Sequence, residues 1–210
     1  MSYKMAHDHA MMTVAITGGI AMGKSSVVED LRLIFSQEAF FDADQCVGEL
    51  LTSGEICEKI SKEFGNAVLG GDGKINRPFL RQQVFDSAKR RNALEDILHP
   101  EVFKCYLGFN QEAMASSTKI LFADIPLLFE TGKEYPRDLV IVVACDKDTQ
   151  LDRLQRRPGL DPGLAFEMVQ SQLPIEKKME LADHVIWNSG SRKQLQQQIK
   201  YFAQWLKQKI

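Results

Sequence analysis

The chain has 210 residues, of which 44% are hydrophobic and 26% are charged, and its formal net charge at pH 7 is -2. This length can bury one substantial core with a small insertion, and the near-neutral charge gives no general attraction to nucleic acid or to an anionic membrane. No apolar stretch approaches the roughly 18 residues that span a bilayer. The four cysteines are far apart and form no CxxC pair, so we interpret them as buried side chains in a reducing compartment and expect a cytoplasmic protein without nucleic-acid or membrane partners.

The first eleven residues do not resemble part of a folded domain. They lack the apolar segment of a secretory signal, and the pair His7 and His9 is more typical of a tail than of a metal site. We predict that residues 1–11 are a disordered tail or an expression scar.

A phosphate-binding loop follows the first predicted strand. The apolar run over 12–17 leads into GGIAMGKS at 18–25, which matches GxxxxGK[ST], and a helical pattern follows. Strand, glycine-rich loop and helix together form the context in which this motif binds a nucleoside triphosphate. Backbone N–H groups are expected to surround the phosphates, while Lys24 reaches the β- and γ-phosphates and the Ser25 hydroxyl holds Mg²⁺. The residues expected to contact the nucleotide here are Gly19, Ile20, Ala21, Met22, Gly23, Lys24, Ser25 and Ser26.

The rest of the chain alternates predicted strands and helices, as in an α/β protein. A short strand over 39–41 ends at Asp42, and the apolar runs over 120–125 and 139–144 suit a parallel sheet that is covered on both faces. A last strand is predicted over 185–188. The apolar positions of a closing amphipathic helix are Leu195, Ile199, Phe202, Leu206 and Ile210.

Residues 45–112 have a different character and are predicted to be a helical insertion on this core. They contain a turn at Gly70-Gly71-Asp72-Gly73 and a helix that Asn76 is expected to cap. A further helix is expected to be interrupted at His99-Pro100.

Carboxylates follow two of the predicted strands. Asp42 and Asp44 stand where a short strand ends, the edge at which open α/β sheets bind ligands. Either could accept the proton of an attacking hydroxyl, or the pair could only cap the next helix. Asp124 ends another strand, where it could help to hold Mg²⁺ or only accept hydrogen bonds from a turn.

A cluster of arginines follows the strand over 139–144. Arg153, Arg156 and Arg157 carry planar, permanently charged groups that suit phosphate. Pro158-Gly159 then breaks the helix, as a hinged lid requires. A solvated basic helix face is the alternative interpretation.

The chain resembles the dephospho-coenzyme A kinase family. The resemblance covers nearly everything after residue 12, and Pro-Leu-Leu-Phe-Glu at 126–130 and Leu-His-Pro at 98–100 are more discriminating than the phosphate loop. The other matching segments, in the family's order, are Ile16-Thr17-Gly18-Gly19-Ile20, Gly23-Lys24-Ser25, Asp42-Ala43-Asp44, Ile75-Asn76-Arg77, Leu80-Arg81, Val84-Phe85, Asp124-Ile125, Gln150-Leu151, Arg153, Arg156-Arg157, Ala182-Asp183-His184-Val185-Ile186 and Asn188.

This resemblance implies transfer of the γ-phosphate of ATP, with Mg²⁺, to the 3′-hydroxyl of the ribose of dephospho-CoA, the last step of coenzyme A synthesis. It implies a P-loop kinase fold, with a three-layer nucleotide core over 12–44 and 113–210, a helical acceptor domain over 45–112 and a lid at about 152–180. Asp44 matches the catalytic carboxylate, with Lys24 and Arg153 also catalytic. Contacts to ATP are implied for Arg157 and Asn188, and contacts to the acceptor for Thr17, Asp42, Arg77, His99, Pro126 and Leu127.

The chain also departs from the family's pattern in the loop and in the lid. The family usually has Gly-Ser where this chain has Ala21-Met22, and alanine tolerates positive φ poorly, so the loop must use ordinary dihedrals or carry strain. Ser26 replaces the common threonine, and Arg157-Pro158-Gly159 replaces a more polar lid sequence, which leaves the roles of the arginines open.

The sequence alone leaves alternatives to this function open. The guanine-reading Asn-Lys-x-Asp of GTPases and the Leu-Ser-Gly-Gly-Gln signature of ABC-type ATPases are both absent. Another small-molecule or nucleotide P-loop kinase would share the loop and the lid, and a nucleotide-gated binding protein would need neither an acceptor site nor Asp44. We expect a monomer or a small homo-oligomer.

Overall fold

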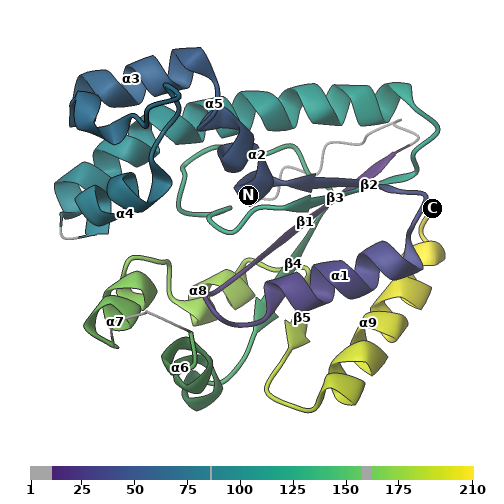
Figure 1. Ribbon diagram of the computed structural model, residues 1–210. Helices are drawn as coiled ribbons and strands as arrows, with labels where there is room; N and C mark the ends of the chain where they lie inside the picture. Colours follow the sequence, from purple (N-terminus) through teal and green to yellow (C-terminus); the bar gives the residue numbers. More distant parts are fainter. Residues whose placement is uncertain (1–10, 86, 158–161) are drawn as a thin grey trace. The chain divides into compact units, whose positions relative to one another are not determined.

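A computed structural model describes residues 11–85, 87–157 and 162–210, and the chain forms two compact units (Figure 1). Unit 1 comprises Met1–Phe41 and Phe109–Ile210, and unit 2 comprises Asp42–Gly108. Residues 1–10 of the predicted tail over 1–11, and the predicted helix break at Pro158-Gly159, lie outside the described residues.

Unit 1 is built on a sheet whose described strands have the order β2-β3-β1-β4-β5 (Figure 1). β1 pairs in parallel with both β3 and β4, and β4 pairs in parallel with β5. This arrangement confirms the predicted α/β class, because continuous apolar runs form parallel strands that are buried on both faces. The strands are β1 (Met12–Gly18), β2 (Ala39–Asp42), β3 (Ile120–Asp124), β4 (Leu139–Ala144) and β5 (His184–Trp187).

Two helices of unit 1, α1 and α9, cover the same face of the sheet (Figure 1). Val14 and Ile16 of β1 point into this layer, where they pack in one core with Leu31 of α1 and Phe202 of α9. The apolar stripe of each helix therefore faces the sheet. No described helix is long and apolar enough to cross a bilayer. The helices are α1 (Lys24–Ile34), α6 (Lys147–Gln155), α7 (Pro162–Gln170), α8 (Ile175–Glu180) and α9 (Arg192–Lys207).

The register of the central strands determines which side chains meet at the carboxyl edge of the sheet. Ile16 of β1 pairs with Asp124 of β3, and Thr17 pairs with Val142 of β4. The N–H of Ile125 also donates to the carbonyl of Ile16, at 2.9 Å. The segments that follow β1 and β3 therefore leave the sheet side by side, at the edge where parallel sheets bind ligands.

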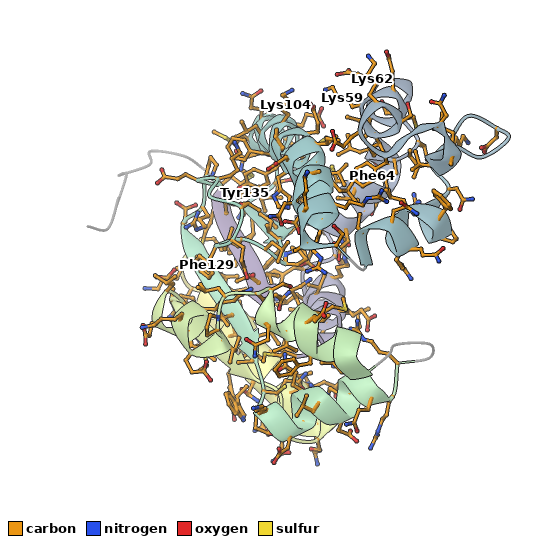
Figure 2. All side chains as sticks on the ribbon, turned by 90° about the vertical axis from the view of Figure 1, so that its left-hand side faces the viewer. Lys59, Lys62, Phe64, Lys104, Phe129 and Tyr135 are labelled. Atoms are coloured by element: carbon orange, nitrogen blue, oxygen red, sulfur yellow. The ribbon has the colours of Figure 1, made fainter. Side chains whose placement is uncertain are left out.

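Unit 2 is helical and has its own small core, which includes Ile56, Ile60 and Leu80. Lys59 lies on the surface of α3 (Figure 2). It contacts Glu101 of α5 at 3.1 Å and so joins these two helices. Its elements are α2 (Ala43–Leu50), α3 (Gly54–Phe64), a 3₁₀ turn (Asn66–Val68), α4 (Arg77–Phe85) and α5 (Ala88–Ala115), whose last residues belong to unit 1.

The predicted turn and helix cap in unit 2 are confirmed. Leu69 and Ile75 form an antiparallel bridge on either side of the glycine-rich turn. The Asn76 side chain accepts a hydrogen bond from the N–H of Phe79 at 3.2 Å, as a capping residue of α4 should.

Several details of the expected fold are wrong. α5 continues through Pro100, because a proline removes one hydrogen bond and a 28-residue helix retains the others. Met11, assigned to the tail, is buried next to β1, whereas Ile210 lies beyond the end of α9 and is exposed. Cys105 is also exposed, unlike the other three cysteines.

Candidate active site

The phosphate loop joins β1 to α1 in an unusual backbone conformation. Gly23 has φ 90° and Ala21 has φ 59°, and Ala21 is the non-glycine residue with positive φ in the described part of the chain. A Cβ atom at position 23 would lie 2.0 Å from Nδ2 of Asn188. Only glycine therefore lets the loop backbone pass this close to Asn188. Of the two possibilities left open for Ala21-Met22, the structure therefore shows the strained one.

The loop presents backbone donors without protein acceptors. Within the described residues, nothing accepts a hydrogen bond from the N–H groups of Ala21, Gly23, Lys24 or Ser25. These groups precede or open α1, so the positive end of the helix dipole adds to them. Converging N–H groups at a helix N-terminus form a site for an anion such as phosphate.

The predicted loop lysine and the predicted metal carboxylate are in contact. The ammonium group of Lys24 forms an ion pair with Oδ1 of Asp124, and the two side chains are only 14% and 10% exposed. The register of β1 and β3 explains this contact, since it places Asp124 beside the strand that leads into the loop. A cation and a hard oxygen ligand thus lie together beside the free N–H groups.

Arg153 and Asn188, which come much later in the sequence, contact the backbone of the phosphate loop. Asn188 donates from Nδ2 to the carbonyl of Met22 at 2.9 Å, and Arg153 donates to the same carbonyl at 3.3 Å. Arg153 also donates to the carbonyl of Asn188 at 2.8 Å. Both side chains therefore support the loop backbone, and their contacts with ATP, like those of the exposed Arg157, stay predictions.

Two predicted acceptor residues of unit 1 lie against each other. Thr17 is fully buried, and its hydroxyl donates to the carbonyl of Pro126 at 2.9 Å. This bond ties the end of β1 to the Pro-Leu-Leu-Phe-Glu segment. Leu127, the next residue, is half-buried.

Four predicted site residues belong to unit 2, where they have different surroundings. Asp42 caps α2, because its carboxylate accepts from the N–H of Gln45 at 2.9 Å. Asp44 is exposed in the first turn of α2, and no described residue shares a hydrogen bond or ion pair with its side chain. Arg77 donates to the carbonyl of Gly48, and His99 is half-buried within α5. Asp42 thus has a structural task that Asp44 lacks.

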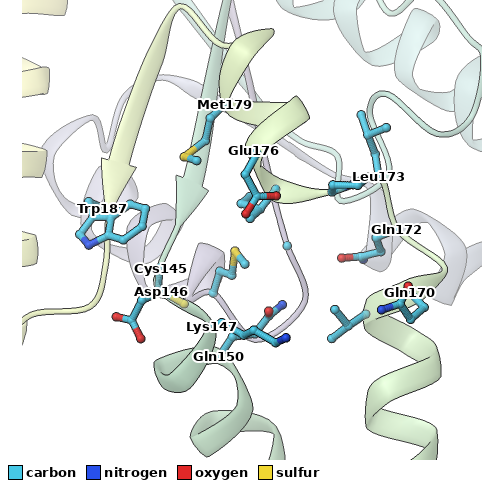
Figure 3. A pocket seen from close by; sticks show the side chains of 15 residues that line it. Cys145, Asp146, Lys147, Gln150, Gln170, Gln172, Leu173, Glu176, Met179 and Trp187 are labelled. Carbon is cyan, nitrogen blue, oxygen red and sulfur yellow. The ribbon is translucent and has the colours of Figure 1, made fainter.

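A cavity of about 330 Å³ lies beside the loop, next to Gly19 and Met22 (Figure 3). Trp187 and other apolar side chains form part of its wall, and Asp146 and Glu176 form another part. The Ser189 hydroxyl and two donors of Thr149 lower the pKa of Asp146 to about 2, so this carboxylate is ionised at neutral pH. Lys147 also lines the cavity, so its polar wall carries charges of both signs.

Two glutamines that the motif analysis did not assign hold the loop at Ile20. Gln172 accepts from the N–H of Ile20 at 2.8 Å, and Gln150 donates to the carbonyl of Ile20 at 2.9 Å. Glutamine is ordinarily a surface residue, and neither of these two was assigned a role from the sequence. Gln150-Leu151 in the family resemblance was the only sequence signal for either residue.

The strain at Ala21 leads to a prediction about stability. Ala21→Gly should raise the free energy of unfolding by about 0.5–1 kcal/mol, because glycine adopts positive φ without a clash and this gain exceeds its entropic cost. Urea unfolding measures the change. Ala93→Gly in α5, a helical position, is the control and should lower the free energy of unfolding by about 1 kcal/mol. A decrease for Ala21→Gly as well would contradict the strain.

Comparisons with known proteins agree with this geometry. The sequence model of a family described as dephospho-CoA kinase matches residues 12–194. A dephospho-CoA kinase of Streptococcus pyogenes is 38% identical over 190 residues, which are 90% of this chain and 95% of that protein. The structure of TT1252 from Thermus thermophilus is 30% identical, with a TM-score of 0.73 over 91% of this chain and 96% of that one. A dephospho-CoA kinase from Campylobacter jejuni is 27% identical, with a TM-score of 0.63 over 93% and 97% of the two chains. With the phosphate loop, the Lys24–Asp124 pair and a match over most of its length, the chain belongs to the dephospho-CoA kinase family.

Proposed function

We propose that the chain transfers the γ-phosphate of ATP, with Mg²⁺, to the 3′-hydroxyl of the ribose of dephospho-CoA, and that it does so in the cytoplasm. The observation that carries the proposal is the pairing of Lys24 with Asp124 in a loop where four N–H groups, those of Ala21, Gly23, Lys24 and Ser25, have no acceptor among the described residues. Phosphate transfer needs this combination of anion donors, a cation and a metal carboxylate.

The residues at the loop fit a magnesium ion. The Asp124 carboxylate and the Ser25 hydroxyl are oxygen ligands, the type that Mg²⁺ prefers. Bound there with ATP, the metal would neutralise charge on the β- and γ-phosphates. Lys24 would then turn from Asp124 toward the same phosphates, while the N–H groups of the loop that have no protein acceptor orient them for in-line attack.

The acceptor hydroxyl needs a base, and we assign that role to Asp44. Its carboxylate is exposed and has no structural partner in the described part of the chain, so it is available to take the proton of the hydroxyl. Arg153 and Arg157 would add positive charge near the transferred phosphate, and Asn188 would contact the nucleotide. Contacts with the acceptor are proposed for Thr17, Pro126 and Leu127 in unit 1 and for Asp42, Arg77 and His99 in unit 2.

The choice of acceptor decides between this function and that of another kinase. Dephospho-CoA should be phosphorylated far better than AMP or adenosine, because binding energy from its long pantetheine arm can orient the reacting hydroxyl. Each acceptor is offered with Mg-ATP, and phosphorus NMR locates the new phosphate.

The same assay tests the alternatives. Equal rates with AMP, or a product phosphorylated at its 5′ end, would indicate a nucleotide kinase. Binding of ATP without transfer to any acceptor would indicate a nucleotide-gated binding protein. Addition of EDTA should stop the reaction if the metal is required.

A further inference from the structure

Lys178 of α8 is a lysine with no exposed surface. Its ammonium group donates to the carbonyl of Gly18 at 3.2 Å and to the carbonyl of Pro126 at 3.3 Å, and it pairs with Oε1 of Glu130 at 2.6 Å. An ammonium group has three N–H donors, so each finds an acceptor here. The charge is fully satisfied, although it is buried.

The two carbonyls belong to the two segments that carry the central pair of the site. Gly18 is the last residue of β1 and starts the phosphate loop, and Pro126 follows Asp124 by two residues. Lys178 therefore holds the Lys24 side of the site at a fixed spacing from the Asp124 side. Thr17, the residue before Gly18, adds a second bond between the same segments, at the carbonyl of Pro126.

Glu130 and Gln172 connect the Lys178 segment to the site at further points. Oε1 of Glu130 accepts from the N–H of Leu173 at 3.0 Å as well as from Lys178. Gln172 holds the N–H of Ile20. The segment 172–178 thus contacts the loop on both sides of Gly19.

Stability alone does not explain a buried charge at this position. Removing an ammonium and a carboxylate from water is costly, and an apolar pair of similar volume is often as stable or more stable. An apolar side chain at position 178 could not donate a hydrogen bond to the carbonyls of Gly18 and Pro126, as Lys178 does. The arrangement is therefore better explained by geometry that the site needs than by the strength of the ion pair.

We propose that Lys178 is a positioning residue, which fixes the phosphate loop relative to the segment after β3 and so aligns Lys24 with Asp124 for transfer. This role rests on the proposed function, because alignment matters only if phosphate is transferred. A displacement of about 1 Å can cost on the order of 10²-fold in rate. Loss of Lys178 should accordingly affect kcat more than the binding of either substrate.

The test removes the donor without leaving a buried unpaired charge. In Lys178→Met/Glu130→Gln both charges are replaced by groups of similar volume, and the amide oxygen introduced at position 130 can still accept from the N–H of Leu173. The double variant should remain folded with an unfolding midpoint close to that of the wild type. Its kcat, expressed per ATP-binding site from calorimetry, should fall about 10–100-fold, while the Kd for ATP and the KM for dephospho-CoA change by less than about threefold.

Two further variants separate positioning from folding. Lys177→Met is the matched control, because Lys177 lies on the same helix but pairs with Glu180 on the surface, and its kcat should not change. Glu130→Gln alone leaves Lys178 with three acceptors, because the amide oxygen at position 130 takes the place of the carboxylate oxygen, but it removes the countercharge of a buried ammonium. Its free energy of unfolding should therefore fall, while kcat per ATP-binding site should stay within about threefold of the wild type.

Three outcomes have distinct meanings. A folded double variant with wild-type kcat would overturn the positioning role. A fall of about 10-fold or more in the kcat of Glu130→Gln, expressed per ATP-binding site so that unfolded protein is not counted, would overturn it as well, even if the double variant did not fold. A wild-type protein that binds ATP but does not phosphorylate dephospho-CoA would instead overturn the proposed function.

Discussion

Lys24→Ala should reduce kcat for phosphate transfer by at least about 10³-fold, while the protein remains folded. The side chain is the cation beside the free N–H groups of the loop, and we propose that it stabilises negative charge on the transferred phosphate. It contributes less to the fold, because its contact in the structure is with Asp124 rather than with the core. Steady-state kinetics gives the loss, and circular dichroism with thermal unfolding checks the fold.

A surface lysine provides the control for this experiment. Lys62 pairs with Glu58 on the outside of α3, and its side chain is 73% exposed. Lys62→Ala should leave kcat unchanged, because surface ion pairs contribute little. Turnover near the wild-type rate in a folded Lys24→Ala variant would show that the loop does not bind the reacting phosphates.

Asp44→Asn should lower kcat by about 10²–10⁴-fold, because an amide keeps the shape of the side chain but cannot take a proton. ATP binding should change little, since the proposed role of Asp44 concerns the acceptor hydroxyl. Single-turnover kinetics separates the chemical step from product release, and calorimetry measures the affinity for ATP.

The neighbouring carboxylate makes this second test specific. Asp42 accepts a hydrogen bond from Gln45 as the cap of α2, and asparagine caps a helix as well as aspartate does. Asp42→Asn should therefore retain stability and most of the activity. A larger loss of kcat in Asp42→Asn than in Asp44→Asn would mean that Asp42 is the base.

The sheet and the loop could be predicted because local sequence determines them. Parallel strands such as β4 are buried on both faces and so appear as continuous apolar runs. The loop appears as glycines at fixed spacing between a strand and a helix. The contact between Lys24 and Asp124 then follows from the edge at which parallel strands end, and the structure contains it.

Other features depend on tertiary contacts that leave no local pattern. Lys178 stands in a run of charged residues that would be expected in solvent, yet its side chain is completely buried beside the loop. Gln172 reaches Ile20 across 152 positions of sequence. Pro100 predicts a helix end, but the surrounding helix is long enough to continue past it.

The contacts at Met22 and Ile20 also have a consequence for folding during synthesis of the chain. The phosphate loop lies near the start of the chain, but Arg153, Gln172 and Asn188, which hold its backbone, are synthesised much later. A growing chain that has just exposed the loop cannot yet give it its final shape, since domains form as units once their parts are available. The loop can therefore bind nucleotide only late in synthesis. Bound nucleotide then stabilises the completely folded protein relative to partly folded forms.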